Sequence, residues 1–447
     1  MDGLACTLTG EPCSALAPAW RAMDDRLCRD RPEPLLVAFS GGGDSLALLL
    51  IARAWAGKVG RPLIAASFDH RLQHASTDWI RWCAERCTSL GVPHLGLTWG
   101  APKPGPGVAS AARLARHRSL ADAARSVGAS VTLFGHTADD VMEAALMRAE
   151  GSTTPSPVPW GPSPVWPEGR GVFILRPLLS VRRAALRTSL QALGETWIED
   201  PANSDLASPR ARARRRLNDG ASSPENPGAR RALAPSASSG PAGELRLPLQ
   251  AVLDANPTDA RRWVAAAILC AAGRQTPPRT RSIDRLLERL RRQDGGRAAL
   301  AGVMIMAEGA DICFTRDTGL RRGDAATIAT LKAGDTGVWD GRFEVLAAQD
   351  VTLGHLSGKA RRLQASAVRI LHRLPPAVRP AIPAATTSAD QISLPTLGDE
   401  VAASMRGLVQ ARFAAATGKI HHESAMVPWR SVSGAPSFRG VCNEAGR

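Results

Sequence analysis

The residues best suited to chemistry form a glycine-rich loop near residue 40. The loop follows the apolar run 35–39 and precedes a helix-forming stretch, and its members are Ser40, Gly41, Gly42, Gly43, Asp44 and Ser45. Glycines at such a turn expose successive backbone N–H groups to an anion, and the start of the next helix adds to the attraction. The loop therefore predicts a phosphate-binding site. Because Asp44 would repel phosphates, the prediction includes a Mg²⁺ ion between them.

A second polar group runs from His136 to Glu143. On a helical wheel Asp139, Asp140 and Glu143 lie opposite an apolar stripe. One interpretation is purely structural, because Thr137 is suited to cap the helix and acids in a first turn complement the helix dipole. The other is functional, because three acids and a histidine at the mouth of a nucleotide site form a set suited to metal binding and acid–base chemistry.

The elements that must position these residues alternate between short apolar runs and longer runs of helical period. Strands are expected at 35–39, 63–68, 94–98, 131–134 and 172–175, and helices at 45–56, 76–90, 108–127, 138–149 and 181–193. This alternation predicts an α/β fold with an open parallel sheet, in which both polar groups meet at the carboxyl edge. Six prolines between residues 151 and 171 predict a loop over the sheet edge.

Composition bounds the rest of the chain. The 447 residues carry a formal charge of +15, and residues 1–220 hold 26 Lys and Arg against 21 Asp and Glu, so most of the excess lies further along. Such a balance favours nucleic acid as partner. Neither a leader segment nor an apolar run of about 18 residues is found, and the eight cysteines form no Cys-x-x-Cys pair. A cytoplasmic protein without a membrane partner is expected.

Domain boundaries follow from composition. We expect an N-terminal extension (1–33), an α/β domain (34–218), a linker rich in Ser, Pro and Gly (219–245), a helical middle domain (246–330) and an α+β C-terminal region (331–447). Stretches rich in small residues and proline are typical of linkers.

Several motifs together carry a family resemblance. Ser-Gly-Gly-x-Asp-Ser after an apolar strand resembles the signature of the PP-loop ATP pyrophosphatases, which cleave ATP between the α- and β-phosphates. The further motifs occur in the order typical of the tRNA(Ile)-lysidine synthetase family, and they are Asp69-His70, residues 112–117, residues 136–144, Arg176-Pro177-Leu178-Leu179 and residues 197–203. The resemblance covers about residues 34–217 and implies an adenine nucleotide α-hydrolase-like fold.

The resemblance also implies a reaction and roles for individual residues. ATP would adenylate carbon-2 of the wobble cytidine of isoleucine tRNA, and free L-lysine would then displace AMP. Asp44, His136 and Asp140 would be catalytic, with Mg²⁺ on Asp44 and Asp140. The loop residues and Arg113 would hold ATP. Substrate and tRNA contacts would come from Glu143, Arg176, Asn203, Arg210, Arg212 and Arg214, and the region 331–447 would bind tRNA.

Departures and alternatives remain. The family's second histidine is Thr137 here, its threonine after the glutamate is Ala144, and its Gly-rich segment is replaced by the Pro-rich stretch. A PP-loop tRNA thiolase would need reactive cysteines, but Cys83 and Cys87 lie on an apolar helix face. A catalytically silent tRNA-binding protein and a small-molecule amide synthetase are further alternatives. The lysine-binding residues stay open, as does the choice between monomer and homodimer.

Overall fold

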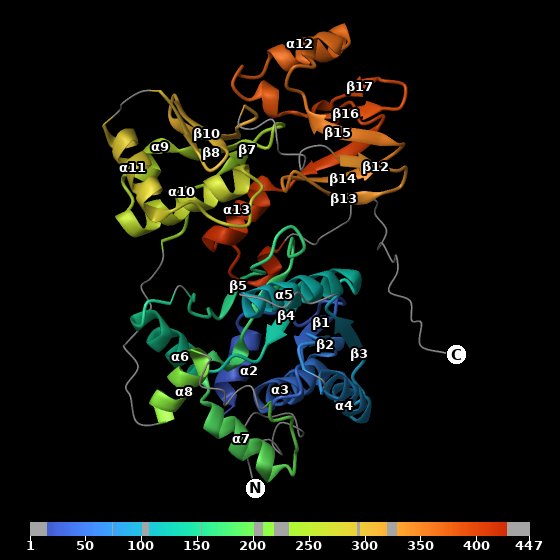
Figure 1. Cartoon of the computed structure of the whole chain (residues 1–447), viewed down its shortest axis with the longest axis vertical. Coiled ribbons are helices and arrows are strands. Elements are labelled where there is room, and N and C mark those ends of the chain that lie inside the picture. The colour runs from blue at the N-terminus through green and yellow to red at the C-terminus, as the bar shows by residue number, and fades with distance from the viewer. Residues whose placement is uncertain are drawn as a thin grey trace. The chain divides into compact units, whose positions relative to one another are not determined.

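The computed structural model in Figure 1 divides into two compact units. It describes residues 16–73, 75–100, 107–152, 154–200, 209–218, 232–292, 296–319 and 329–426. The first unit comprises Met1–Ala229, Ile420–Trp429 and Phe438–Arg447, and the second comprises Arg230–Lys419 and Arg430–Ser437. The chain therefore returns to the first unit after building most of the second. Across the described ranges no helix is long and apolar enough to span a bilayer.

The first unit is built on a six-stranded sheet in the order β3-β2-β1-β4-β6-β5. The strands are β1 (Leu35–Ala38), β2 (Leu63–Asp69), β3 (His94–Thr98), β4 (Val131–Phe134), β5 (Trp160–Pro162) and β6 (Phe173–Leu175). All neighbours pair in parallel except β5 and β6, which are antiparallel. The predicted α/β fold is confirmed.

One edge of the sheet differs from the expectation. The Pro-rich segment contributes the short strand β5, whereas the sequence predicted only a loop there. Prolines are tolerated in an edge strand because one side of that strand needs no ladder partner. The sheet is therefore mixed, with one antiparallel edge.

Helices connect the strands and fill both faces of the sheet with apolar side chains. They are α2 (Ala17–Asp24), α3 (Gly43–Val59), α4 (Ser76–Ser89), α5 (Val108–Ser126), α6 (Ala138–Ala149), α7 (Arg183–Ala192) and α8 (Pro209–Asn218). Helix α5 packs Leu120 and Ala124 against Leu36 of β1 and Phe134 of β4 in one buried cluster. The rigid sheet thereby fixes the strand ends from which the site residues project.

The described residues of the second unit form three sheets. The five-stranded sheet consists of β7 (Ser238–Ser239), β8 (Leu245–Pro248), β9 (Arg297–Leu300), β10 (Val303–Glu308) and β11 (Asp311–Arg316). The four-stranded sheet has β12 (Ala329–Leu331), β15 (Val351–His355), β16 (Pro383–Thr387) and β17 (Ile392–Ser393), and the three-stranded sheet has β13 (Thr336–Trp339), β14 (Phe343–Ala347) and β18 (Ala403–Gly407). Its helices are α9 (Leu249–Leu253), α10 (Pro257–Ala271), α11 (Thr280–Arg291), α12 (Ala365–His372) and α13 (Val409–Thr417).

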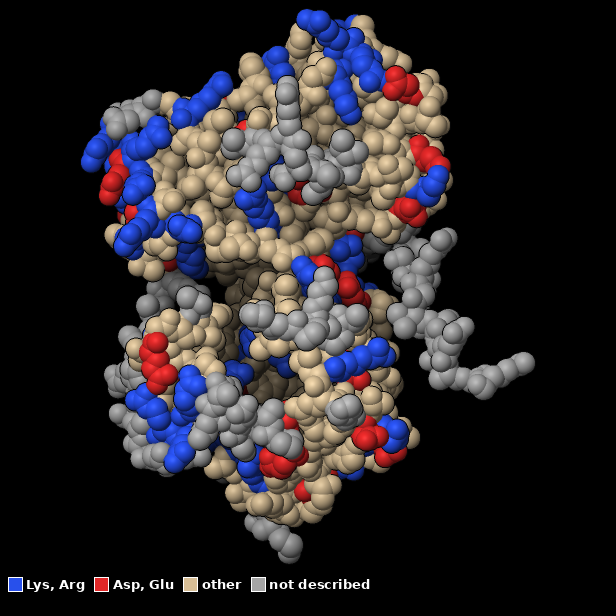
Figure 2. All heavy atoms as spheres, viewed as in Figure 1, with Lys and Arg blue, Asp and Glu red and all other residues tan. Residues whose placement is uncertain are grey.

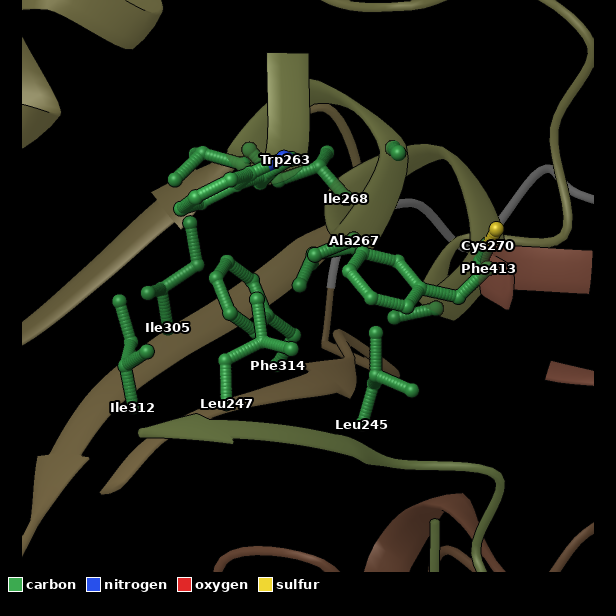
Figure 3. Close-up of a cluster of buried hydrophobic side chains, with 14 of the residues drawn as sticks. Leu245, Leu247, Trp263, Ala267, Ile268, Cys270, Ile305, Ile312, Phe314 and Phe413 are labelled. Atoms are coloured by element: carbon green, nitrogen blue, oxygen red, sulfur yellow. The ribbon is translucent and has the colours of Figure 1, made fainter. Parts of the chain in front are cut away.

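A buried cluster joins helices to the five-stranded sheet in this unit. Figure 3 shows Trp263 and Ile268 of α10 with Phe314 of β11 and Phe413 of α13. The unit thus extends across residue 330, where the sequence placed a domain boundary, and the separate middle and C-terminal domains stay a prediction.

Candidate active site

The glycine-rich loop turns directly from β1 into α3. Gly41 has a φ of +81°, a conformation that favours glycine, and Gly42 is the N-cap of α3. The Ser45 hydroxyl accepts a hydrogen bond from the backbone N–H of Ser40 (3.2 Å) and donates one to the carbonyl of Gly42 (2.8 Å). Within the described ranges nothing accepts from the N–H groups of Gly42 and Gly43. These N–H groups are therefore available to an anion at the positive end of α3.

Residues 197–198 pack against the same loop. A Cβ atom on Gly41 would lie 2.4 Å from Cδ1 of Ile198, and one on Gly43 would lie 3.5 Å from the Trp197 ring. The N–H of Ile198 also donates to the carbonyl of Gly41 (3.0 Å). The glycines thus serve packing as well as anion binding, and this motif supports the loop. Asn203, the last residue of the motif, lies outside the described residues.

The end of β4 touches the start of α3. A Cβ on Gly135 would lie 3.0 Å from the carbonyl oxygen of Asp44 and 3.2 Å from Cα of Ser45. His136 follows at once, so the two polar groups found in the sequence meet at one edge, as expected for parallel strands.

A single guanidinium connects the three acids of the site. Arg183, the first residue of α7, lies with Nε 2.8 Å from Oδ2 of Asp44 and with Nη1 3.0 Å from Oε1 of Glu143. Its Nη2 is 3.5 Å from Oδ2 of Asp140. The sequence analysis missed Arg183, whose only signal was its place at the start of a helix after the Arg176-Pro177-Leu178-Leu179 motif.

The acids of α6 also stabilise helix ends. Oδ2 of Asp140 accepts from the N–H (2.8 Å) and the hydroxyl (3.0 Å) of Thr137, which forms a capping box. Oδ2 of Asp139 accepts from the backbone N–H of Arg183 (2.7 Å), which fixes the start of α7 against α6. The structural interpretation of Asp139 and Asp140 is therefore confirmed, and Oδ1 of Asp140 lies 3.7 Å from Nη2 of Arg210.

The surroundings of Asp44 and Asp140 shift their pKa values in opposite directions. Burial raises the pKa of Asp44 above its ordinary value, although Arg183 opposes this. Burial also acts to raise the pKa of Asp140, but the hydrogen bond from Thr137 and the neighbouring positive charges outweigh it, so this pKa is lowered. Asp140 therefore remains ionised in a site where Asp44 takes up protons more readily.

Helix α8 contributes two of its arginines. Nε of Arg210 lies 3.1 Å from Oε2 of Glu143, and Nε of Arg214 lies 2.8 Å from Oε1. The Glu143 side chain is fully buried, so these contacts and Arg183 balance its charge. Arg212, between them in sequence, is exposed. Helix α8 thus presents Arg210 and Arg214 to Glu143, whereas Arg212 lies on an exposed face.

A basic group lies on the other side of His136. Nε of Arg176 donates to Nδ1 of His136 (3.2 Å). Burial lowers the pKa of Arg176 to about 10, and repulsion from Arg113 adds to the effect. The pKa of Arg113 is also lowered, first by burial and then by Arg210. Mutually repelling guanidinium groups of this kind favour an anionic ligand.

The carboxylates are compatible with a nucleotide-bound magnesium ion. No cluster of three or more His, Cys, Asp or Glu with metal-binding geometry occurs in the described parts of the chain. Mg²⁺ at nucleotide sites is commonly held by one or two carboxylates together with phosphates and water. Asp44 and Asp140 supply two such carboxylates, which are paired with Arg183 (2.8 Å) and, through Oδ1 of Asp140, with Arg210 (3.7 Å). The residues therefore fit the ion as a partner of ATP phosphates.

These features define the class of the protein. A phosphate-binding loop after β1, with acids at the same edge of a mostly parallel sheet, is the arrangement of an ATP-utilising PP-loop domain, and the family model described as PP-loop domain matches residues 19–221.

Whole-chain comparison narrows this class to one family. The chain is 44% identical over 415 residues to tRNA(Ile)-lysidine synthase of Caulobacter vibrioides. The aligned residues make up 90% of this chain and 98% of that protein. It is 36% identical to the enzyme of the same name from Hyphomonas neptunium, over 72% of this chain and 92% of that protein. The chain therefore belongs to the tRNA(Ile)-lysidine synthase family, as the ordered motifs predicted.

A solved structure offers a more remote likeness. The U34-tRNA thiolase NcsA from Methanococcus maripaludis, with its [4Fe-4S] cluster, matches with a TM-score of 0.39 and 16% identity, over 48% of this chain and 73% of that one.

Proposed function

We propose that the protein uses ATP to attach L-lysine to carbon-2 of the wobble cytidine of isoleucine tRNA, with release of AMP and pyrophosphate. The observation that carries this proposal is that Arg183 joins Asp44 of the PP-loop to Asp140 and Glu143 of α6, in a chain of this family. The reaction would take place in the cytoplasm as one ligase activity, in a monomer or a homodimer.

The site residues have distinct proposed roles. The loop N–H groups would bind the ATP phosphates, with Arg113 as a further contact. Mg²⁺ would be held by Asp44 and Asp140, and when bound it would neutralise charge on the phosphates. Glu143 has no exposed surface, so it would act on the lysine amine only after an arginine of α8 moves away. Arg210, Arg212, Arg214 and Arg176 would contact tRNA or substrate, as would Asn203.

Unit 2 offers a surface suited to RNA. Figure 2 shows basic side chains gathered over the position of α11, where Arg281, Arg285 and Arg289 are exposed. The apolar residues Ile283, Leu286 and Leu287 of this helix are buried. Phosphate contacts of this kind would add salt-dependent affinity for tRNA.

The decisive experiment is a transfer assay. The protein is incubated with ATP, labelled lysine and isoleucine tRNA that carries the unmodified wobble cytidine, and label in RNA is measured together with AMP and pyrophosphate. We expect all three products, and none when the wobble cytidine is replaced by uridine. Label without this dependence, or no label, would refute the proposal.

The alternative activities make different predictions. Burial raises the pKa of Cys83 to about 11 and that of Cys87 to about 12, which leaves both thiols protonated and unsuited to sulfur transfer. A silent tRNA-binding protein would bind tRNA without releasing pyrophosphate. The same assay therefore separates the alternatives.

A further inference from the structure

The hydrogen bond between Arg176 and His136 fixes which ring nitrogen carries the proton. Nε of Arg176 lies 3.2 Å from Nδ1 of His136. A guanidinium has only N–H donors and no acceptor, so Nδ1 must be the accepting nitrogen. A neutral His136 ring in this arrangement carries its single proton on Nε2.

Both side chains are held in place from several directions. Nη1 of Arg176 donates to the carbonyl of Val158 (2.9 Å), and its guanidinium lies over the Phe134 ring (5.9 Å to the centroid). Phe134 in turn stacks on His136, with 5.9 Å between centroids and 8° between planes. Nε2 of His136 has no hydrogen-bond partner within the described ranges. One nitrogen is thus occupied by protein, and the other is available to a ligand.

We propose that Arg176 is a positioning residue that holds His136 as a neutral ring whose Nε2–H donates to a phosphoryl oxygen of ATP. This inference rests on the proposed use of ATP and goes beyond it, because it excludes His136 as the general acid or base of the reaction. His136 directly follows Gly135, whose backbone packs against Asp44 and Ser45, so the residue lies at the sheet edge that carries the predicted phosphate site. No proton leaves the ring when it acts as a donor.

The surroundings of His136 favour the neutral ring. Arg176 follows β6, Arg113 and Arg116 face the ring from α5, and Asp140 faces it from α6. Burial lowers the pKa of His136 to about 3, and Arg176 contributes next, while Asp140 opposes both. Protonation of the ring would also place an N–H on Nδ1 facing the N–H of Arg176 Nε, and their hydrogen bond would be lost. The ring therefore stays neutral at pH values where an ordinary histidine titrates.

The test compares variants of the full chain by nitrogen NMR of the histidine side chains. The His136 signal is assigned from its loss in His136→Gln. We expect wild type to show a protonated Nε2 and an unprotonated Nδ1 from pH 5.5 to 8. In Arg176→Gln the pKa of the ring should rise because one repelling charge is removed, although burial still holds it below its ordinary value, and the proton should no longer be confined to Nε2. Arg176→Lys keeps a donor without an acceptor and should retain the wild-type tautomer.

Kinetics give an independent measure. The rate of tRNA-dependent AMP release should fall by on the order of 10-fold to 100-fold in Arg176→Gln, and its decline toward acidic pH should begin at a higher pH than in wild type. Arg81→Gln removes an exposed arginine of α4 that pairs with Asp78 (2.9 Å), and should behave as wild type.

Some outcomes would overturn the inference. A wild-type His136 that carries its proton on Nδ1, or that titrates near pH 6.5, excludes it even if Arg176→Gln fails to fold. An unchanged His136 signal in a folded Arg176→Gln protein also excludes it. These measurements need no lysine transfer, so they fail or succeed separately from the proposed reaction.

Discussion

At the level of residues, the three acids of the candidate site are matched by the arginines that contact them. Asp44, Asp140 and Glu143 face three guanidinium groups, of which that of Arg183 alone reaches all three acids. Carboxylates brought this close without a cation would repel one another, and protonation would relieve the repulsion. Arg183 therefore offsets the repulsion among the three acids when no ligand cation is near.

Replacing Arg183 tests this role. We expect Arg183→Gln to lower tRNA-dependent AMP release by about 100-fold or more, and to reduce the free energy of unfolding by about 2 kcal/mol, because charge-assisted hydrogen bonds to Glu143 and Asp44 are lost. Urea unfolding and the AMP assay measure the two effects. Arg182→Gln is the control, since Arg182 is exposed and pairs with Asp139 instead (3.1 Å). Equal losses in both variants would contradict the assignment.

A buried histidine in unit 2 gives a prediction about pH. Burial lowers the pKa of His355 to about 4, while Asp340, 3.5 Å away, opposes the shift. Between pH 4 and about 6.5 the unfolded chain binds the proton that the folded chain refuses, so stability rises with pH and is lost as pH falls. His355→Asn should reduce this slope by about 1.4 kcal/mol per pH unit. An unchanged slope in urea unfolding from pH 4.5 to 7.5 would refute it.

The sequence predicted some of these residues and not others. Asp44, Asp140 and Glu143 were predictable because each lies in a motif directly after a strand. Arg183 was not, because its role depends on Asp139 fixing the start of α7 against α6. That contact joins residues 44 apart in the chain, and no local pattern encodes it.

At the level of elements, the PP-loop is shaped by the segment that covers it. The positive φ of Gly41 and its approach to Ile198 are separate reasons for glycine. Helix bounds in the first unit agree with the sequence periodicity within a few residues. Strand β5 was missed because its prolines argue against a strand unless its position at the sheet edge is known.

Substitutions of two glycines distinguish the cost of backbone strain from that of a steric contact with Ile198. Gly41→Ala should lower the free energy of unfolding by more than the roughly 1–2 kcal/mol expected for an alanine in a left-handed conformation, because its Cβ would also lie 2.4 Å from Ile198. The variant should also lose most of its ATP use. Gly91 has a φ of +66° with nothing within 4 Å, so Gly91→Ala should show the strain alone and keep activity. Adding Ile198→Ala to Gly41→Ala should restore part of the stability. If it restores none, the contact is not the cause.

At the level of the whole molecule, residues 420–426 complete the first unit. The Glu423 carboxylate receives both terminal nitrogens of Arg61 at 2.7 Å, and neither side chain has exposed surface. The N–H of Cys28 also donates to Glu423 (2.9 Å), and Trp160 Nε1 donates to the carbonyl of Ile420 (2.9 Å). The unit therefore depends on contacts between residues that are 260 to 395 positions apart in the chain.

Breaking this pair should be costly. Glu423→Gln leaves the Arg61 charge buried without a counter-ion, so we expect a loss of about 3–5 kcal/mol in the free energy of unfolding. Lys332→Ala is the control, because Lys332 and Asp350 form a solvent-exposed pair (2.7 Å) whose loss should change the free energy of unfolding little. Differential scanning calorimetry and urea unfolding measure both. A loss below about 1 kcal/mol in Glu423→Gln would contradict the expectation.

The distance in sequence between Arg61 and Glu423 has a consequence for synthesis on the ribosome. Arg61 is translated long before its counter-ion, so the nascent ATP-utilising unit carries a cation that its folded state must bury unpaired until Glu423 emerges. Translation proceeds at about 5–20 residues per second, so this interval lasts for tens of seconds. Most of the second unit is translated during that interval, and the ion pair of the first unit forms only when the returning segment has been made.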